Sequence, residues 1–203
     1  MTAQIPQMTD MVLDLEGGLL PVAYPFALWE ALKLVAPALE EEKSVGVLPL
    51  RGTSNKEGLL LSKRSKMVVR LPAAIADQTA ARLSGQQLDV AGRPIRLGAA
   101  KMRPIYPFPT LHAPLVTGSS DEVVFAEKIG TQLGEMGIKG KLICGKRRSI
   151  GDDRRSVQGF SLVIHDLKAD ASLHLQFVGL GEERQYGCGI FVPSKVITGL
   201  SED

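Results

Sequence analysis

The stretch PIYPFPT, residues 104–110, carries three prolines in seven positions. Proline fixes φ and has no N–H to donate, so such a segment is extended and stiff and continues neither a helix nor a central strand. We therefore interpret it as a connector. It divides the 203 residues into an N-terminal half, residues 1–104, and a C-terminal half, residues 105–203.

Upstream of the connector, the pattern of apolar residues predicts the order strand, helix, strand, strand, helix, strand. Residues 11–15 (MVLDL) alternate apolar and polar residues, as in a half-buried strand. Pro37 is expected to kink or end the first helix early. The predicted strands are residues 11–15, 45–50, 59–61, 67–71 and a pair within 88–97, and the predicted helices are residues 26–42 and 73–85.

Downstream of the connector the same order repeats. The predicted elements are a strand over 111–117, a helix over 123–137 capped within 119–121, strands over 141–146 and 157–164, a short helix over 171–178 capped by Asp170, and a strand over 190–192. The turn of the 141–164 hairpin is expected to hold KRRSIGDDRR. Two copies of βαββαβ predict an α+β fold of two tandem ferredoxin-like (RRM-like) halves.

Positive charge is concentrated in the C-terminal half. Residues 139–155 hold seven Lys or Arg and two Asp, which leaves 17 basic and 20 acidic residues elsewhere in the chain. A near-neutral protein with one dense basic segment indicates a localised site for a polyanion. The alternative is a solvated hairpin whose charges have no ligand. A second basic cluster, Lys63, Arg64 and Lys66, separates two apolar strands and has the same two readings.

The remaining composition argues against several classes of protein. No N-terminal stretch resembles a signal peptide, and no apolar run is long enough to span a bilayer, so we expect a cytoplasmic protein without a membrane partner. Cys144 and Cys188 are far apart and outside any CxxC motif, which argues against a zinc site or disulfide framework. Asp152 and Asp153 lack further carboxylates nearby in sequence, so we expect no metal and no cofactor.

Residues 179–189 (GLGEERQYGCG) form the densest glycine motif. A dinucleotide-binding loop would need a strand before it and a helix after it, and here the order is reversed. Such a loop can still bring backbone N–H groups close to phosphates, and this reading assigns RNA contacts to Gly181, Gly187 and Gly189, with Arg184 adding charge. The alternative is a helix C-cap at Gly179 followed by a tight turn.

The C-terminal stretch GLGEERQYGCGIFVP, residues 179–193, resembles the glycine-rich signature of the CRISPR-associated endoribonucleases that cut precursor CRISPR RNA, members of the RAMP superfamily. Other segments are similar to a compact branch of that family. They are LPVAYPFALWEAL (20–32), GLLLSKRSKMVVRLP (58–72), LDVAGRPIRLG (88–98), GIKGKLICGKRRSIG (137–151) and VQGFSLVIHDL (157–167). The resemblance covers nearly the whole chain.

The resemblance implies a function and a chemistry. Such enzymes bind a repeat RNA, often a hairpin, and cleave one bond without a metal: a ribose 2′-hydroxyl attacks the adjacent phosphate and leaves a 2′,3′-cyclic phosphate. It implies repeat RNA as the partner, with other subunits of a CRISPR effector complex as further candidates. The side chains that it assigns to RNA are Arg51, Arg64, Lys66, Lys141, Lys146, Arg147, Arg148, Arg154 and Arg155.

The candidate catalytic residues are Tyr24, His112 and Lys63. Tyr24 stands where many family members carry a histidine, and a phenol is a poorer base than imidazole at neutral pH. His112 opens the C-terminal half, and Lys63 or a neighbouring cation is expected near the scissile phosphate. Two alternatives stay open: a repeat-RNA-binding protein without catalysis, and a structural subunit of an RNA-guided complex that coats RNA irrespective of its length.

Overall fold

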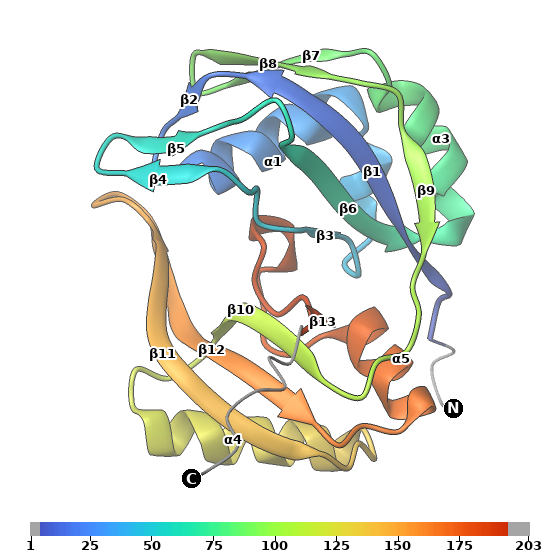
Figure 1. Ribbon diagram of the computed structural model, residues 1–203, viewed down its shortest axis with the longest axis vertical. Coiled ribbons are helices and arrows are strands. Elements are labelled where there is room, and N and C mark those ends of the chain that lie inside the picture. Colours follow the sequence, from blue (N-terminus) through green and yellow to red (C-terminus); the bar gives the residue numbers. More distant parts are fainter. Residues whose placement is uncertain (1–4, 195–203) are drawn as a thin grey trace, which may run out of the picture.

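The computed structural model describes residues 5–194 and shows two α+β halves, one above the other in Figure 1. The elements of the N-terminal half are β1 (Met8–Gly17), β2 (Leu19–Leu20), α1 (Tyr24–Val35), α2 (Ala38–Glu41), β3 (Gly46–Val47), β4 (Thr53–Asn55), β5 (Gly58–Leu60), β6 (Lys66–Pro72), α3 (Ala73–Leu83), β7 (Gln87–Val90), β8 (Arg93–Leu97) and β9 (Lys101–Pro104). Those of the C-terminal half are β10 (Leu111–Thr117), α4 (Glu122–Glu135), β11 (Lys141–Gly151), β12 (Ser156–His165), α5 (Ala169–Val178), the 3-10 turn η1 (Arg184–Tyr186) and β13 (Val192–Pro193).

Both halves have the ferredoxin-like strand order, so the predicted fold class is confirmed. In the C-terminal half the order is β11-β12-β10-β13. In the N-terminal half β3, β6, β1 and β9 follow the same order, and the β7–β8 hairpin extends the sheet from the end of β1. The strands β2, β5 and β4 form a separate small sheet.

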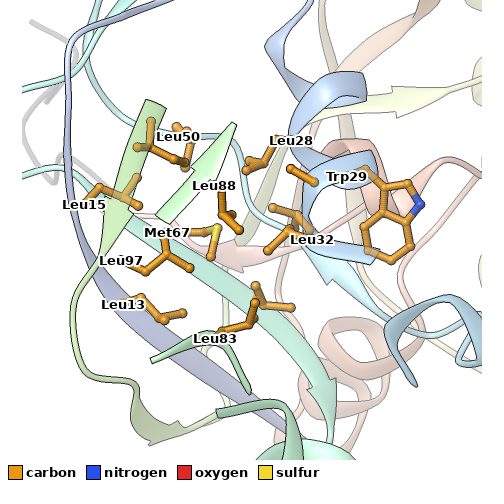
Figure 2. Packing of buried hydrophobic residues seen from close by; sticks show 14 of the residues in the cluster. Leu13, Leu15, Leu28, Trp29, Leu32, Leu50, Met67, Leu83, Leu88 and Leu97 are labelled. Carbon is orange, nitrogen blue, oxygen red and sulfur yellow. The ribbon is translucent and has the colours of Figure 1, made fainter. Parts of the chain in front are cut away.

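Each half has its own hydrophobic cluster. In the N-terminal half, Leu32 of α1 points toward Met67 and Leu88 of the strands (Figure 2). In the C-terminal half, Phe125 of α4 packs on Phe160 of β12, with ring centroids 4.9 Å apart. Within residues 5–194, no helix is both long and apolar enough to cross a membrane.

The structure confirms some details of the predicted elements and differs in others. Pro37 ends the first helix at Val35, and a separate short helix follows it. The strand predicted over 45–50 shrinks to β3, since only Gly46 and Val47 pair with β6. The hairpin of the C-terminal half is longer than predicted: β11 runs to Gly151, so the turn spans only residues 152–155. Asp121 caps α4 as expected, whereas Lys168 and not Asp170 is the N-cap of α5.

Two β-bulges lie opposite the same residue, Ser161 of β12. On β10 the register shifts between Ala113 and Val116, and on β11 it shifts between Cys144 and Arg147. Each of these strands therefore has one extra residue there. Pro114 explains the bulge in β10, because proline cannot donate to a sheet ladder.

Buried arginines join the two halves at the C-terminal end of α5. Arg70 of β6 is 1% exposed and donates from Nη1 to the carbonyl oxygens of Gln176 (3.1 Å) and Phe191 (2.7 Å). Its Nε and Nη2 donate to the buried carboxylate of Asp10, at 2.8 and 3.2 Å. Cations at a helix C-terminus satisfy carbonyl groups that have no partner within the helix.

Arg184 approaches the same helix end from the glycine-rich loop. Its Nη1 and Nη2 donate to the carbonyl oxygens of Val178 (2.7 Å) and Phe177 (3.2 Å), and its Nε donates to the Ser44 carbonyl oxygen of the N-terminal half (3.2 Å). Burial, reinforced by the charge of Arg70, lowers the pKa of the Arg184 guanidinium to about 10. The two halves are therefore held together by hydrogen bonds from two buried arginines.

Candidate nucleic-acid interface

The predicted basic segment forms the outer part of the β11–β12 hairpin. Lys146, Arg147 and Arg148 lie on β11 itself and not in a turn, and all three side chains are exposed. Asp152 organises the turn, where one carboxylate oxygen accepts the backbone N–H groups of Arg154 (2.9 Å) and Arg155 (3.0 Å). These two hydrogen bonds lower the pKa of the Asp152 carboxyl. The hairpin thus presents its cations from a regular, pinned scaffold.

Arg155 differs from the other cations of the hairpin. Its guanidinium lies over the rings of Phe26 (4.5 Å) and Tyr186 (4.6 Å), and it donates to the Tyr186 hydroxyl at 2.8 Å. Phe26 belongs to α1 of the N-terminal half, so this contact fastens the tip of the hairpin to the other half. All five cations are exposed, but Arg155 also docks the tip of the hairpin on these rings, a contact that Lys146, Arg147, Arg148 and Arg154 do not make.

His112 and Arg148 share the open face of the C-terminal sheet. Leu111 and Ala113 are buried in the core, so His112 between them points to the opposite face. Arg148 pairs with Gly159, which lies on that same face because Phe160 points into the core. Burial, reinforced by the charge of Arg148, lowers the pKa of the half-buried His112 imidazole. This imidazole is therefore neutral over more of the physiological pH range than a solvated one.

A cleft of about 600 Å³ lies between the halves and gathers the second basic cluster. Arg51, Arg64 and Lys66 line it, as do Arg103 and the connector, which sequence reasoning did not connect with a site. Lys63 lies in the exposed turn before β6 and is not part of the lining. Val192 also lines the cleft and pairs directly with His112. Directly opposed residues point to the same side of a sheet, so the side chains of His112 and Val192 share one face of it.

The other cleft cations are partly engaged by carboxylates. Arg103 Nη2 lies 3.1 Å from Asp10 Oδ2, and Lys66 Nζ lies 3.0 Å from Asp14 Oδ1. The Lys66 ion pair is exposed, and it lowers the pKa of the Asp14 carboxyl. Arg70 is fully occupied in the interface between the halves. Asp10 is the single carboxylate among the lining residues, so the cleft carries a net positive charge.

Tyr24 is the first residue of α1, and its hydroxyl oxygen accepts the backbone N–H of Leu50 at 3.0 Å. The ring packs against the N-terminal core, and burial raises the pKa of the phenol above its ordinary value. A raised pKa leaves even less of the phenolate, the form that accepts a proton, near neutral pH. The contact holds the chain just before Arg51, so the structure favours a positioning role over proton transfer.

The glycine-rich loop has a different role from the predicted one. Gly187 and Gly189 have φ of 92° and 65° and are buried, so RNA cannot reach their backbone N–H groups. A Cβ at Gly187 would lie 3.0 Å from Pro49 Cγ of the N-terminal half. Only Gly181 is exposed, and the N–H groups of Gly187 and Gly189 are bonded to carbonyl oxygens of Arg184 and Leu115. Of the residues predicted to contact RNA, Gly187 and Arg184 lie where the two halves meet, and Gly189 is hydrogen-bonded to Leu115 and Leu180 within the C-terminal half.

The last predicted RNA-contact residue, Lys141, lies apart from the cleft. Lys141 is exposed at the start of β11 and forms an ion pair with Asp166 at 3.0 Å. No group of three His, Cys, Asp or Glu side chains in residues 5–194 is arranged to hold a metal ion.

The chain was compared with known proteins. The Cas6 family model, described as "Cas6 Crispr", matches residues 9–196. The chain is 37% identical over 186 residues to the CRISPR-associated endonuclease Cas6 of Myxococcus xanthus (strain DK1622). The aligned region covers 91% of this chain and 80% of that protein.

Solved structures of low sequence identity share the fold. A CRISPR-associated Cas6 protein superposes with a TM-score of 0.65 at 13% identity, covering 93% of this chain and 100% of that one. A RAMP protein described as binding different RNA substrates superposes with a TM-score of 0.65 at 11% identity, covering 90% of this chain and 98% of that one. Thermus thermophilus Cse3 bound to an RNA that represents a pre-cleavage complex gives 0.53 at 15% identity, covering 92% and 98%. The family match and the Myxococcus relative together show that this chain belongs to the Cas6 family of CRISPR-associated proteins.

Proposed function

We propose that this chain is an endoribonuclease that binds CRISPR repeat RNA and cleaves it to produce guide RNAs. The activity named for the 37%-identical Myxococcus relative supports the reaction class. The solvent-facing cations of the hairpin support a duplex RNA stem as the bound element. In A-form RNA the deep major groove is too narrow for side chains, and shape and phosphates are recognised instead.

The observation that carries the proposal is that His112 and Arg148 lie on the same open face of the C-terminal sheet, where the charge of Arg148 acts on the half-buried His112 imidazole and helps to lower its pKa. In the proposed reaction, neutral His112 accepts the proton of a ribose 2′-hydroxyl. The 2′-oxygen bonds to the adjacent phosphorus, the bond to the 5′-oxygen breaks, and that oxygen takes up a proton from water. The products are a 2′,3′-cyclic phosphate and a 5′-hydroxyl. Arg148 stabilises the charge that develops on the phosphorane oxygens.

A single 2′-deoxy substitution in the RNA tests this mechanism. Placed at the nucleotide before the cut, it should abolish cleavage and leave the dissociation constant nearly unchanged, because it removes the nucleophile and no phosphate. Cleavage of the unmodified RNA should continue in EDTA, since none of the proposed steps uses a metal ion. A deoxy substrate that is still cut, or activity that EDTA abolishes, would contradict the mechanism.

A second test concerns how the hairpin binds RNA. Changing Lys146, Arg147, Arg148 and Arg154 together to glutamine should make the slope of log K against log salt shallower by roughly three to four, taking the value for duplex DNA of about 0.9 per phosphate. The matched control is Arg93→Gln with Arg96→Gln, which removes exposed charges from β8. An unchanged slope in the hairpin variant would place the phosphate contacts elsewhere.

A further inference from the structure

Two aromatic rings of the connector are exposed at the cleft. Tyr106 is 63% exposed and Phe108 is 42% exposed, and both line the 600 Å³ space between the halves. Neither ring belongs to either hydrophobic cluster. Large exposed apolar side chains beside one another in a concave site indicate that the surface binds something.

The main chain that carries these rings is fixed by buried polar side chains of α5. Gln176 Nε2 donates to the Tyr106 carbonyl oxygen at 2.8 Å, and Ser172 Oγ accepts the Phe108 N–H at 2.9 Å. Gln176 and Ser172 are 1% and 0% exposed. The connector therefore cannot turn its rings into the core without breaking buried hydrogen bonds, and the rings are held ready for a ligand at little further cost in entropy.

Cations line the same cleft as these two rings. Arg51, Arg64 and Arg103 line the cleft with them, and the Arg103 side chain is 56% exposed even though it is paired with Asp10. A positively charged groove with exposed aromatic rings is the arrangement that binds single-stranded nucleic acid, because the cations follow the phosphates and successive bases stack on the rings. Paired bases are already stacked within the duplex and cannot use such rings.

We infer that Tyr106 and Phe108 form a stacking platform for unpaired nucleotides, separate from the hairpin that contacts the stem. The inference rests on the proposed function for its class of ligand, RNA, and adds which part of the RNA enters the cleft. Val192 connects the platform with His112, since it lines the cleft and pairs with His112 in the sheet. An unpaired strand on the platform would thus lead directly to the face that carries His112.

The test uses a fluorescently labelled oligoadenylate of about ten nucleotides, within the range of single-strand site sizes. Tyr106→Ala and Phe108→Ala should each weaken its binding by roughly 5- to 150-fold, the range measured for loss of one base–aromatic stack. The salt slope should stay unchanged, because no charge is removed. Tyr106→Phe keeps the ring and should bind like the unaltered protein. The fluorescence of an adenine analogue that emits when unstacked, placed within the oligoadenylate, should be quenched when the RNA binds. In the double variant Tyr106→Ala with Phe108→Ala the analogue should keep its fluorescence.

The controls separate this inference from the proposed function. Leu34→Ala removes an 85%-exposed apolar side chain from α1 and should leave oligoadenylate binding unchanged. A blunt-ended RNA hairpin should bind the alanine variants as tightly as the original protein. Equal oligoadenylate affinity in the alanine variants would overturn the platform, as would equal losses for the blunt hairpin. A protein that holds oligoadenylate on these rings but neither binds nor cuts repeat RNA would retain the platform and overturn the proposed function.

Discussion

Replacing His112 by glutamine should lower the rate of repeat-RNA cleavage by about 10²–10⁴-fold, the usual contribution of a general base or acid. Glutamine keeps a polar side chain of similar reach but cannot accept the proton at neutral pH. The dissociation constant for RNA should change little, because His112 is neutral and contributes no phosphate contact. Single-turnover cleavage with binding measured in parallel checks both expectations.

The pH dependence provides an independent readout of the same residue. Only neutral His112 can act as the base, so the rate should fall as the pH drops through its lowered pKa. Burial and the charge of Arg148 disfavour the imidazolium, so Arg148→Gln should raise this pKa and move the acid limb to higher pH. A limb that stays in place in Arg148→Gln would show that another group controls the rate.

Tyr24→Phe is the matched comparison for His112→Gln. It leaves the Leu50 N–H without its acceptor, and we expect a loss of about 1–3 kcal/mol in the free energy of unfolding. The cleavage rate should change only a few-fold. A large loss of rate at unchanged stability and affinity would instead assign the chemistry to Tyr24.

Replacing Arg70 by methionine should lower the free energy of unfolding by about 3–5 kcal/mol, because it breaks a buried ion pair and leaves one charge without this partner. The carbonyl oxygens of Gln176 and Phe191 also lose their donor. Urea unfolding measures the effect, and Arg93→Met on the exposed part of β8 is the control. The double variant Asp10→Leu with Arg70→Met should be less destabilised than the single one, since no buried carboxylate is then left with the exposed Arg103 as its remaining partner. Stability within about 0.5 kcal/mol of the unaltered protein would show that the interface does not depend on Arg70.

Local signals in the sequence were sufficient for most helices and strands. The cap at Asp121 and the proline break at Pro37 act on neighbouring backbone, so they could be predicted from a few residues. The length of the basic hairpin was missed because a run of Arg and Lys reads as a turn. In the structure β11 is an edge strand, where exposed charges cost little and also protect the edge from pairing.

The candidate site depended on contacts that sequence spacing does not reveal. His112 was predicted as a candidate, but its relation to Arg148 arises only from strand register. The cleft brings Arg51 and Arg103 together with the connector, although they lie far apart in the chain. One signal was available and not used: Asp10 and Arg70 each interrupt an apolar strand, which in a buried strand indicates an ion pair.

The bulge in β11 makes the number of residues in this strand a functional parameter. With the regular alternation that begins at Cys144, Arg148 would point toward α4, together with the core residues. The extra residue between Cys144 and Arg147 reverses the alternation and turns Arg148 to the face of His112. Deleting Gly145 or Lys146 would move every side chain from there to the hairpin tip to the opposite face of the sheet. The charged side chains from Arg147 onward would all still be present. The hairpin should therefore tolerate substitutions in this stretch far better than changes in its length.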